Sequence, residues 1–291
     1  MDFWSKAIDV YTTTGDYFGV ASLSVTILIV IVKWFKSGRK KKKSQHILNK
    51  LCQCRKNDCV KIVIPYHELS PSLYGTRHYV LANEMDEIQR LYQLFWKVYG
   101  FQKIALPSSN MESNLNIYIG GPAVSPEVSM CFYNHIPSFR CVFYGKRKQY
   151  ESTQNNDHFF ECDDTVMSDG KVHEGFYFKS QTQPFKKELS VSLINGKQKH
   201  FHTDYALFVR IKESNVETKQ SNIIMFGQSS CGTQAAVDFF INHYDVFNKL
   251  VEQNGHKNEN FMFCFNVTPN NSGSGAIDQK SLIDLSKYID F

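Results

Sequence analysis

The chain opens with a long apolar stretch and continues with shorter apolar runs separated by polar turns. In the stretch 17–35 nearly every side chain is apolar, and Lys33 is its one charged residue. A helix of this length spans about 28 Å, close to the thickness of a bilayer's hydrocarbon core. A soluble helix would instead show a polar face. The pattern therefore predicts a single transmembrane helix over residues 17–35.

From residue 58 onward, the pattern predicts alternating strands and helices. Compact apolar runs that end at glycines or polar turns indicate strands, and apolar stripes at helical spacing indicate helices. The expected strands cover residues 59–65, 115–119, 223–226 and 261–267, and 261–267 is expected to be the last strand. Apolar stripes predict helices over 83–100 and from Thr233 to Gly255. A further helix is predicted after Ser125, where Ser125, Pro126 and Glu127 provide an N-cap, a first-turn proline and a first-turn acid. This alternation predicts one α/β domain over residues 58–291, with a Rossmann-like, mostly parallel sheet.

Residues 139–212 follow a different pattern. Several short runs rich in β-branched and aromatic residues are separated by polar turns. Asn195 and Gly196 lie between two such runs, and this dipeptide favours the turn of a β-hairpin. We therefore expect residues 139–212 to form an antiparallel β-rich insertion in the domain.

The charged residues give the expected transmembrane helix an orientation. Residues 1–43 contain eight Lys and Arg and three Asp, whereas residues 44–291 contain 25 basic and 25 acidic residues, so the net charge of +5 belongs to the first part. The basic cluster 36–43 follows the apolar stretch, and the positive-inside rule then places residues 1–16 outside and the domain in the cytoplasm. A cleaved signal peptide would carry its positive charges on the other side. The expected location is the cell membrane, crossed once.

Two short segments flank the expected helix. The arm 1–16 carries Phe3, Trp4 and Tyr11 at a spacing that suits either a helix on the membrane surface or a tail held by its aromatic residues. Residues 36–57 form a basic juxtamembrane linker that contacts anionic lipid headgroups. The even charge balance of the rest of the chain does not favour a nucleic-acid partner. The charges thus predict the lipid bilayer as a partner.

The eight cysteines of the chain are expected to be reduced thiols, as is usual in the cytoplasm. Cys52, Cys54 and Cys59, with His46 nearby, have a spacing that matches no zinc-binding template, and no second ligand pair follows them. We therefore expect neither a metal site nor a cofactor.

Three strand-to-helix loops carry the candidate ligand-binding residues. In an open α/β sheet, ligands bind beyond the carboxyl ends of the strands, where helix N-termini offer free N–H groups and a partial positive charge. The candidates follow three of the expected strands: His67; Gly120, Gly121 and Ser125; and Gly227, Ser229, Ser230, Gly232 and Thr233. Together they predict a site for a phosphate or carboxylate group. The alternative interpretation is that these glycines only let a helix pack closely on its strand.

The loop 227–233 has the G-x4-G spacing of a phosphate-binding loop but lacks two of its functional residues. Thr233 stands where that motif has Lys, and Gln234 stands where it has Ser or Thr. Without the lysine and the magnesium-binding hydroxyl, ATP hydrolysis is disfavoured. The loop therefore predicts binding of an anion rather than hydrolysis of ATP.

Three motifs within residues 115–267 resemble a known group of domains. The GGP motif 120–122 follows a strand, the DYAL motif 204–207 opens a β run, and the loop 227–233 opens an amphipathic helix. In this order they resemble uncharacterised prokaryotic Rossmann-like sensory domains that are joined to diverse effector modules. With one transmembrane helix, the layout is also similar to membrane effectors of bacterial antiviral signalling. That resemblance implies a nucleotide-derived messenger as ligand and disruption of the bilayer as output.

An enzyme is the alternative interpretation of the same loops. The GGP motif, with Glu127 at the start of the following helix, is similar to nucleoside deoxyribosyltransferase-like and nucleotide glycosidase sites, in which a carboxylate attacks or stabilises the anomeric carbon. Cys231 at a helix start is a second candidate nucleophile. Both also have structural explanations, Glu127 as a first-turn helix acid and Cys231 as a buried, inert thiol. A third alternative is a membrane scaffold that recruits a protein partner.

From these observations we expect a membrane-anchored cytoplasmic sensor that binds a small anionic, nucleotide-derived ligand. A lone transmembrane helix cannot enclose a pore, so an action on the membrane needs several copies of the chain. We therefore expect ligand binding to assemble a homo-oligomer, and we favour a role other than catalysis.

Overall fold

The computed structural model describes most of the predicted α/β domain. It covers residues 33, 36–54, 58–63, 67–72, 75–79, 82–100, 104–105, 113–122, 125–136, 139–142, 175–178, 185–188, 191–194, 198–201, 204–214, 219–269, 275–289 and 291. The predicted arm 1–16 and, apart from Lys33, the predicted transmembrane helix 17–35 lie outside these residues. Within the described ranges, no helix combines the length and apolar character that a bilayer crossing requires.

The chain divides into two compact units, Met1–His46 and Ile47–Phe291. In the first unit, residues 36–46 are helical. In the second unit, residues 47–52 are helical and include three fully buried side chains, those of Leu48, Leu51 and Cys52. The core of the second unit therefore includes the end of the segment predicted as a juxtamembrane linker.

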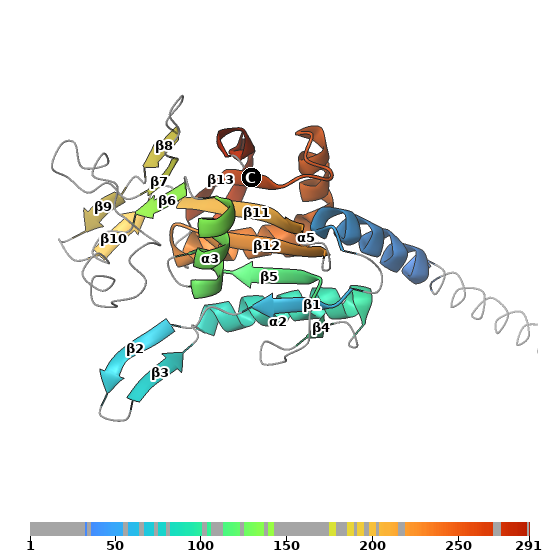
Figure 1. Cartoon of the computed structure of the whole chain (residues 1–291), viewed down its shortest axis with the longest axis horizontal. Helices are drawn as coiled ribbons and strands as arrows, with labels where there is room; N and C mark the ends of the chain where they lie inside the picture. Colours follow the sequence, from blue (N-terminus) through green and yellow to red (C-terminus); the bar gives the residue numbers. More distant parts are fainter. Residues whose placement is uncertain are drawn as a thin grey trace, which may run out of the picture. The chain divides into compact units, whose positions relative to one another are not determined.

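A seven-stranded mixed sheet forms the centre of the second unit (Figure 1). The strands are, in spatial order, β14 (Gly275–Asp284), β13 (Phe261–Pro269), β11 (Asp204–Ser214), β12 (Lys219–Gly227), β5 (Leu115–Ile119), β1 (Val60–Val63) and β4 (Ile104–Ala105). The pairings from β12 to β4 are parallel, with Ile117 opposite Ile223, and the pairings from β12 to β14 are antiparallel. The α/β prediction is confirmed, but the expectation of a mostly parallel sheet is wrong, because half of the pairings are antiparallel.

The position of β11 accounts for most of this difference. The predicted insertion 139–212 includes most of this strand, yet β11 lies in the main sheet between β12 and β13. Residues 204–211 are all buried, and a strand buried on both faces has no apolar–polar alternation to show which sheet it joins. The expectation that residues 261–267 form the last strand is also wrong, because β14 pairs with β13. Half of the residues of β14 are polar, and all of its residues are at least partly exposed, so the strand has no compact apolar run.

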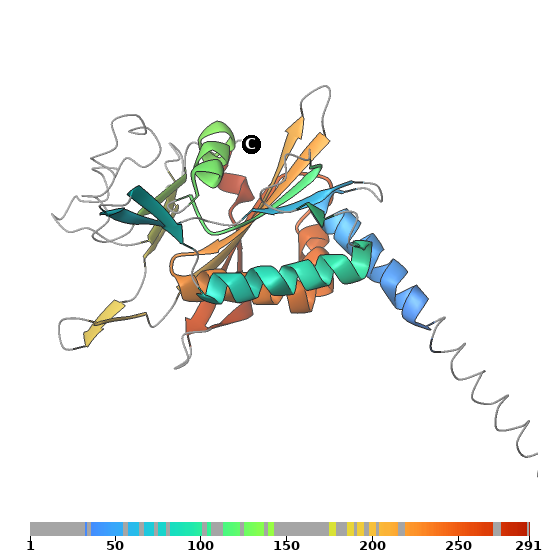
Figure 2. The same cartoon turned by 90° about the horizontal axis from the view of Figure 1, so that it is seen from below.

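Helices cover both faces of the sheet. α2 (Ala82–Tyr99) and α5 (Ser230–Gln253) pack on one face, and α3 (Pro126–His135) packs on the other, as Figure 2 shows. α2 and α5 confirm the segments predicted from apolar stripes, and α3 confirms the helix predicted from its N-terminal signals at 125–127. Gly100 and Gly255 follow the ends of α2 and α5, as expected.

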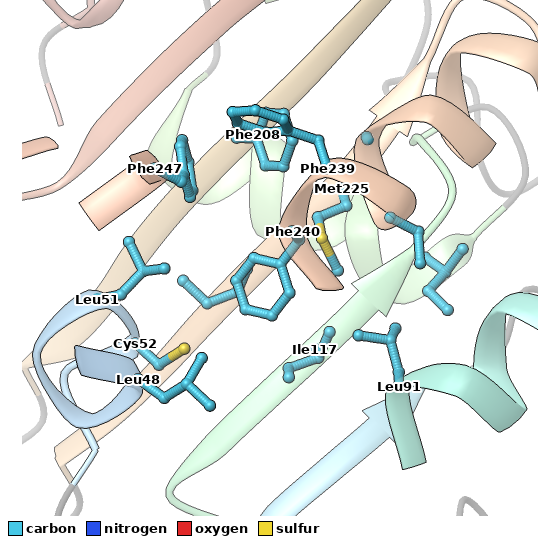
Figure 3. Packing of buried hydrophobic residues seen from close by; sticks show 14 of the residues in the cluster. Leu48, Leu51, Cys52, Leu91, Ile117, Phe208, Met225, Phe239, Phe240 and Phe247 are labelled. Atoms are coloured by element: carbon cyan, nitrogen blue, oxygen red, sulfur yellow. The ribbon is translucent and has the colours of Figure 1, made fainter. Parts of the chain in front are cut away.

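Two apolar clusters, one on each face, hold these layers together. The cluster under α2 and α5 is rich in phenylalanine, and the ring centroids of Phe208 and Phe247 are 4.5 Å apart. Leu51 points into this cluster (Figure 3). In the cluster under α3, the rings of Phe132 and Phe226 meet edge to face at 5.7 Å. Side chains of alternate parity along each central strand enter the two clusters, which is the reason both helix layers stay attached.

Arg210 is a fully buried charge on β11. Its guanidinium donates to the carbonyl oxygens of Leu51 (2.7 Å), His256 and Glu259, and it lies 4.6 Å from the centroid of the Phe261 ring. Burial lowers the pKa of Arg210 to about 10, which leaves the group charged at neutral pH. Arg210 therefore fastens the helical segment 47–52 and the turn after α5 to the central sheet.

The remaining described strands form three small antiparallel sheets. They are β2 (His67–Ser72) with β3 (Gly75–Tyr79); β6 (Phe139–Val142), β7 (Gly175–Phe178) and β8 (Phe185–Glu188); and β9 (Val191–Ile194) with β10 (Gln198–Phe201). Ile194 lies opposite Gln198, so the two runs pair as an antiparallel hairpin, as predicted. Three residues, 195–197, connect them, and the predicted turn at Asn195 and Gly196 lies outside the described residues. The predicted position of His67 is wrong. His67 begins β2 and pairs with Tyr79, and it does not lie in a loop that leads directly into a helix.

Candidate functional site

The connections after β1, β5 and β12 leave the same edge of the sheet. These strands are adjacent and parallel, so their carboxyl ends lie side by side, as predicted. The connections after β1 and β12 lead to α2 and α5 on one face, whereas the connection after β5 leads to α3 on the other (Figures 1 and 2). Open α/β sheets bind ligands where neighbouring connections diverge in this way. The topology thus makes this carboxyl edge the candidate site.

The loop 227–233 binds a carboxylate that belongs to the protein itself. Asp204 is fully buried, and its carboxylate accepts hydrogen bonds from the backbone N–H groups of Tyr205 (2.7 Å), Gly232 (2.7 Å) and Ser229 (3.3 Å), and from the Ser229 hydroxyl. Because β11 runs antiparallel to β12, the first residue of β11 lies beside the loop that follows β12. Burial raises the pKa of Asp204, although its four hydrogen bonds act in the opposite direction.

Other N–H groups of this loop also have partners within the protein. The N–H of Gly227 donates to Oγ1 of Thr233 (2.9 Å), and the N–H of Cys231 donates to Oγ of Ser229 (3.1 Å), the N-cap of α5. The N–H of Thr233 donates to the carbonyl oxygen of Ser229 (3.1 Å), while Ser230 is exposed. A phosphate-binding loop would offer such donors to its ligand. Here they stabilise the start of α5, and the anion at the loop is Asp204.

Gly227 and Gly232 let α5 pack directly on the sheet. A Cβ atom at Gly227 would lie 2.4 Å from Cα of Gly232, and a Cβ atom at Gly232 would lie 2.3 Å from the carbonyl oxygen of Tyr205. Both distances are far shorter than a carbon atom tolerates, and both neighbours are backbone atoms that cannot turn away. The geometry therefore supports the alternative interpretation of the G-x4-G spacing, which is close packing of a helix on its strand.

Asp204 is the residue of this region whose role the sequence does not reveal. It belongs to the DYAL motif, but no local pattern links it to a loop more than twenty positions later. A usable signal would have been an acidic residue that opens an otherwise apolar strand, because such a charge needs several hydrogen-bond donors when it is buried.

Cys231 is partly buried in the first turn of α5. Burial and the nearby Asp204 carboxylate raise the pKa of the Cys231 thiol to about 11. A thiol with this pKa is protonated at neutral pH and is a poor nucleophile. The geometry therefore does not favour Cys231 as a catalytic residue.

The loop after β5 is held against β12. Gly120 has a φ of +98° and donates its N–H to the carbonyl oxygen of Met225 (2.9 Å). A side chain at this φ would be strained. A Cβ atom at Gly121 would lie 2.8 Å from the Phe226 ring, so this position also favours glycine. Ser125 then caps α3, as predicted.

Glu127 is an exposed carboxylate at this edge, in the first turn of α3. It accepts a hydrogen bond from the Ser125 hydroxyl (3.0 Å). Its position is that of the first-turn acid predicted from the sequence. Because a carboxylate only accepts hydrogen bonds, Glu127 matches the hydroxyl groups of a sugar better than it matches a phosphate.

The cysteines 52 and 54 take part in packing. Cys52 is fully buried, and burial raises the pKa of its thiol. The sulfur of Cys54 lies 3.4 Å from the Tyr99 hydroxyl and 3.5 Å from Oδ1 of Asn49. Cys54 thus attaches residues 47–54 to Tyr99 at the end of α2, whereas Cys52 belongs to the apolar cluster under α2 and α5.

Comparisons of the chain with protein-family models, with curated proteins and with solved structures gave no match.

Proposed function

We propose that this protein is a membrane-anchored sensor that binds a small, nucleotide-derived ligand at the carboxyl edge of β1, β5 and β12. The observation that carries the proposal is the divergence of the three connections at this edge, with α3 on one face and α2 and α5 on the other. This arrangement is typical of ligand sites in open α/β sheets. The apolar stretch 17–35 supplies the anchor in this proposal.

The residues at the edge suggest how such a ligand is held. In the loop 120–122, Gly120 is buried and Gly121 is partly exposed, so the ligand contacts the loop through the backbone of Gly121. Glu127 beside it accepts hydrogen bonds from ribose hydroxyls. Asp204 already fills the donors of the loop 227–233, so the ligand's anionic group lies elsewhere along the edge. The ligand is therefore recognised through its nucleoside part at α3.

The sensor acts by self-association. Ligand binding shifts the equilibrium between separate and assembled chains only if the assembled state binds the ligand more tightly, since equal affinity shifts nothing. Assembly then brings several copies of the segment 17–35 together. Several copies are needed because a single helix cannot enclose a pore.

The test uses the full-length chain purified in detergent. Small molecules that co-purify are identified by mass spectrometry, and candidate nucleotides are titrated by calorimetry with Glu127→Gln and, as a control, Asp245→Asn, which changes an exposed carboxylate far along α5. Glu127→Gln should weaken binding about 10- to 100-fold, the effect of losing a hydrogen bond to a charged group. Equal affinity in both variants would remove Glu127 from the site, and no binding of any nucleotide would refute the proposed function.

A second candidate function rests on the same residue. Glu127 is exposed, lies in the first turn of the helix that follows the GGP motif, and accepts a hydrogen bond from Ser125. This is a suitable position for a carboxylate that attacks or stabilises an anomeric carbon. In that case the bound nucleotide would be cleaved, and Glu127→Gln would abolish release of the free base while binding persists. A sensor would return the nucleotide unchanged, so chromatography of the nucleotide after incubation separates the two functions.

A further inference from the structure

Three side chains that bind transition metals converge at the C-terminal end of α3. They are Cys131 and His135 on α3 and Glu213 on β11, and one donor atom from each lies within 4.8 Å of the others. Cys131 is buried, and the other two are partly exposed. α3 starts at the carboxyl edge of β5 and packs back along the sheet, so its last turn lies away from the proposed ligand site. The cluster is therefore separate from that site.

The fold brings these residues together by two independent routes. Cys131 and His135 are four positions apart on α3, which places them on the same side of the helix. Glu213 comes from the second half of β11, where it pairs with Gln220 of β12. Val128 and Phe132 anchor α3 in the apolar cluster on this face of the sheet. The trio thus depends on packing between a helix and a strand about eighty positions apart, and no sequence spacing reveals it.

A buried amide orients the carboxylate of the cluster. Nδ2 of Asn222 donates to Oε1 of Glu213 (2.9 Å) and lies 3.9 Å from the sulfur of Cys131. Asn222 is itself held by Nδ2 of Asn116, which donates to its Oδ1 (3.0 Å). Asn116 and Asn222 are 5% and 2% exposed, so this polar chain is rigid. Hydrogen bonds of this kind fix the direction of a ligating carboxylate in metal sites.

We infer that Cys131, His135 and Glu213 bind a zinc ion. A thiolate, an imidazole and a carboxylate together are a ligand set that favours Zn²⁺ over Mg²⁺ or Ca²⁺, which prefer oxygen alone. Tetrahedral coordination needs donor atoms about 3.3–3.6 Å apart, and the donor atoms here lie within 4.8 Å of one another. Rotation of the partly exposed His135 side chain draws them together, while Asn222 keeps the Glu213 carboxylate in place. The Cys131 thiol loses its proton to solvent as the ion binds. A water molecule or another small ligand completes the fourth position.

The ion fastens the end of α3 to β11. Two of its ligands come from the helix and one from the sheet, so binding adds a cross-link to the mainly apolar contact between the two layers. An ion bound only by the folded state raises its stability. Because two of the three ligands are partly exposed, the ion can exchange with solvent and is removable by a chelator.

The full-length chain, first treated with a chelator, is titrated with Co²⁺ and then with Zn²⁺. We expect one Co²⁺ per chain to give a thiolate-to-cobalt charge-transfer absorption that Zn²⁺ abolishes, together with a raised Tm. Cys131→Ser should remove this absorption, whereas the matched controls Cys231→Ser and Cys59→Ser should keep it. The Cys59 control also tests the cysteine-rich segment 52–59 as the source of the signal.

Two further variants guard against misfolding of Cys131→Ser. His135→Gln changes a partly exposed residue in the last turn of α3, and Glu213→Gln retains an oxygen that can accept from Asn222. Each should weaken Zn²⁺ binding at least about tenfold and leave the Tm of the metal-free protein nearly unchanged. Absence of the absorption in folded wild-type protein, or its persistence in Cys131→Ser, would overturn the inference, as would unchanged affinity in both His135→Gln and Glu213→Gln.

Discussion

Replacement of Asp204 by alanine tests whether the loop 227–233 is built around an internal carboxylate. The change removes the acceptor of four hydrogen bonds, including those from the N–H groups of Tyr205 and Gly232. Asp204 itself is 0% exposed, so water cannot replace it without rearrangement. A buried donor left without a partner costs about 1–3 kcal/mol. The two N–H donors of Tyr205 and Gly232 would both lose their acceptor, and this cost is partly offset because a buried charge is also removed. The expected loss in the free energy of unfolding is about 2–4 kcal/mol.

The loss is measured as a change in Tm. For a domain of this size, 1 kcal/mol corresponds to about 2–4 °C, so Asp204→Ala should lower Tm by roughly 5–15 °C. Asp245→Ala is the matched control, since Asp245 is exposed on the same helix, α5. A Tm within about 2 °C of wild type would show that the carboxylate does not stabilise the start of α5.

The pH dependence of this loss gives a second, independent check. Burial raises the folded-state pKa of Asp204 above its ordinary value. The native state then holds the proton more tightly than the unfolded state does. The stability that this adds is fully present below the unfolded pKa, about 4, and is lost as the pH rises through the folded pKa. The destabilisation by Asp204→Ala should therefore be larger near pH 4 than at pH 8, and the reverse order would refute the burial argument.

Three other changes follow from the geometry. Gly227→Ala should destabilise the protein by more than about 2 kcal/mol, because the new Cβ atom would meet the backbone of α5. Gly38→Ala is the control, since a Cβ atom there has nothing within 4 Å. Equal Tm values for the two variants would contradict the close packing of α5 at Gly227. Arg210→Met should lower the Tm and increase proteolysis near residues 47–52, and unchanged proteolysis would show that the arginine does not hold that segment. Cys231 should react with iodoacetamide roughly a hundredfold more slowly in the native than in the unfolded chain at pH 7, and faster as the pH approaches 11; equal rates would contradict its raised pKa.

Local signals in the sequence predicted much of the fold. Apolar stripes marked the helices α2 and α5, the N-terminal signals at 125–127 marked α3, and short apolar runs marked β1, β5, β12 and β13. These features depend on hydrogen bonds and side-chain periodicity within a few neighbouring residues. The shared edge after β5 and β12 was also predictable, since parallel neighbours end at the same side of a sheet.

The candidate site was only partly predictable. The glycine pattern in the loop 227–233 is the same whether the N–H groups bind an outside anion or a carboxylate of the protein. What decides between the two is the position of Asp204, and that position follows from β11 pairing with β12 in the main sheet. A strand that is buried on both faces is apolar throughout, so its sequence does not show which distant strand it pairs with or in which register.

The sequence by itself determined the positions of α2, α3, α5 and four strands of the main sheet, and that a long apolar stretch precedes a charge-balanced α/β region. The tertiary structure alone decided which residues meet. It placed Asp204 on the first turn of α5, Arg210 on the carbonyl of Leu51, and the Cys131, His135 and Glu213 trio between α3 and β11. The physical reason is that local structure is set by interactions between neighbours in the chain, whereas these contacts depend on how whole layers pack over the two apolar clusters.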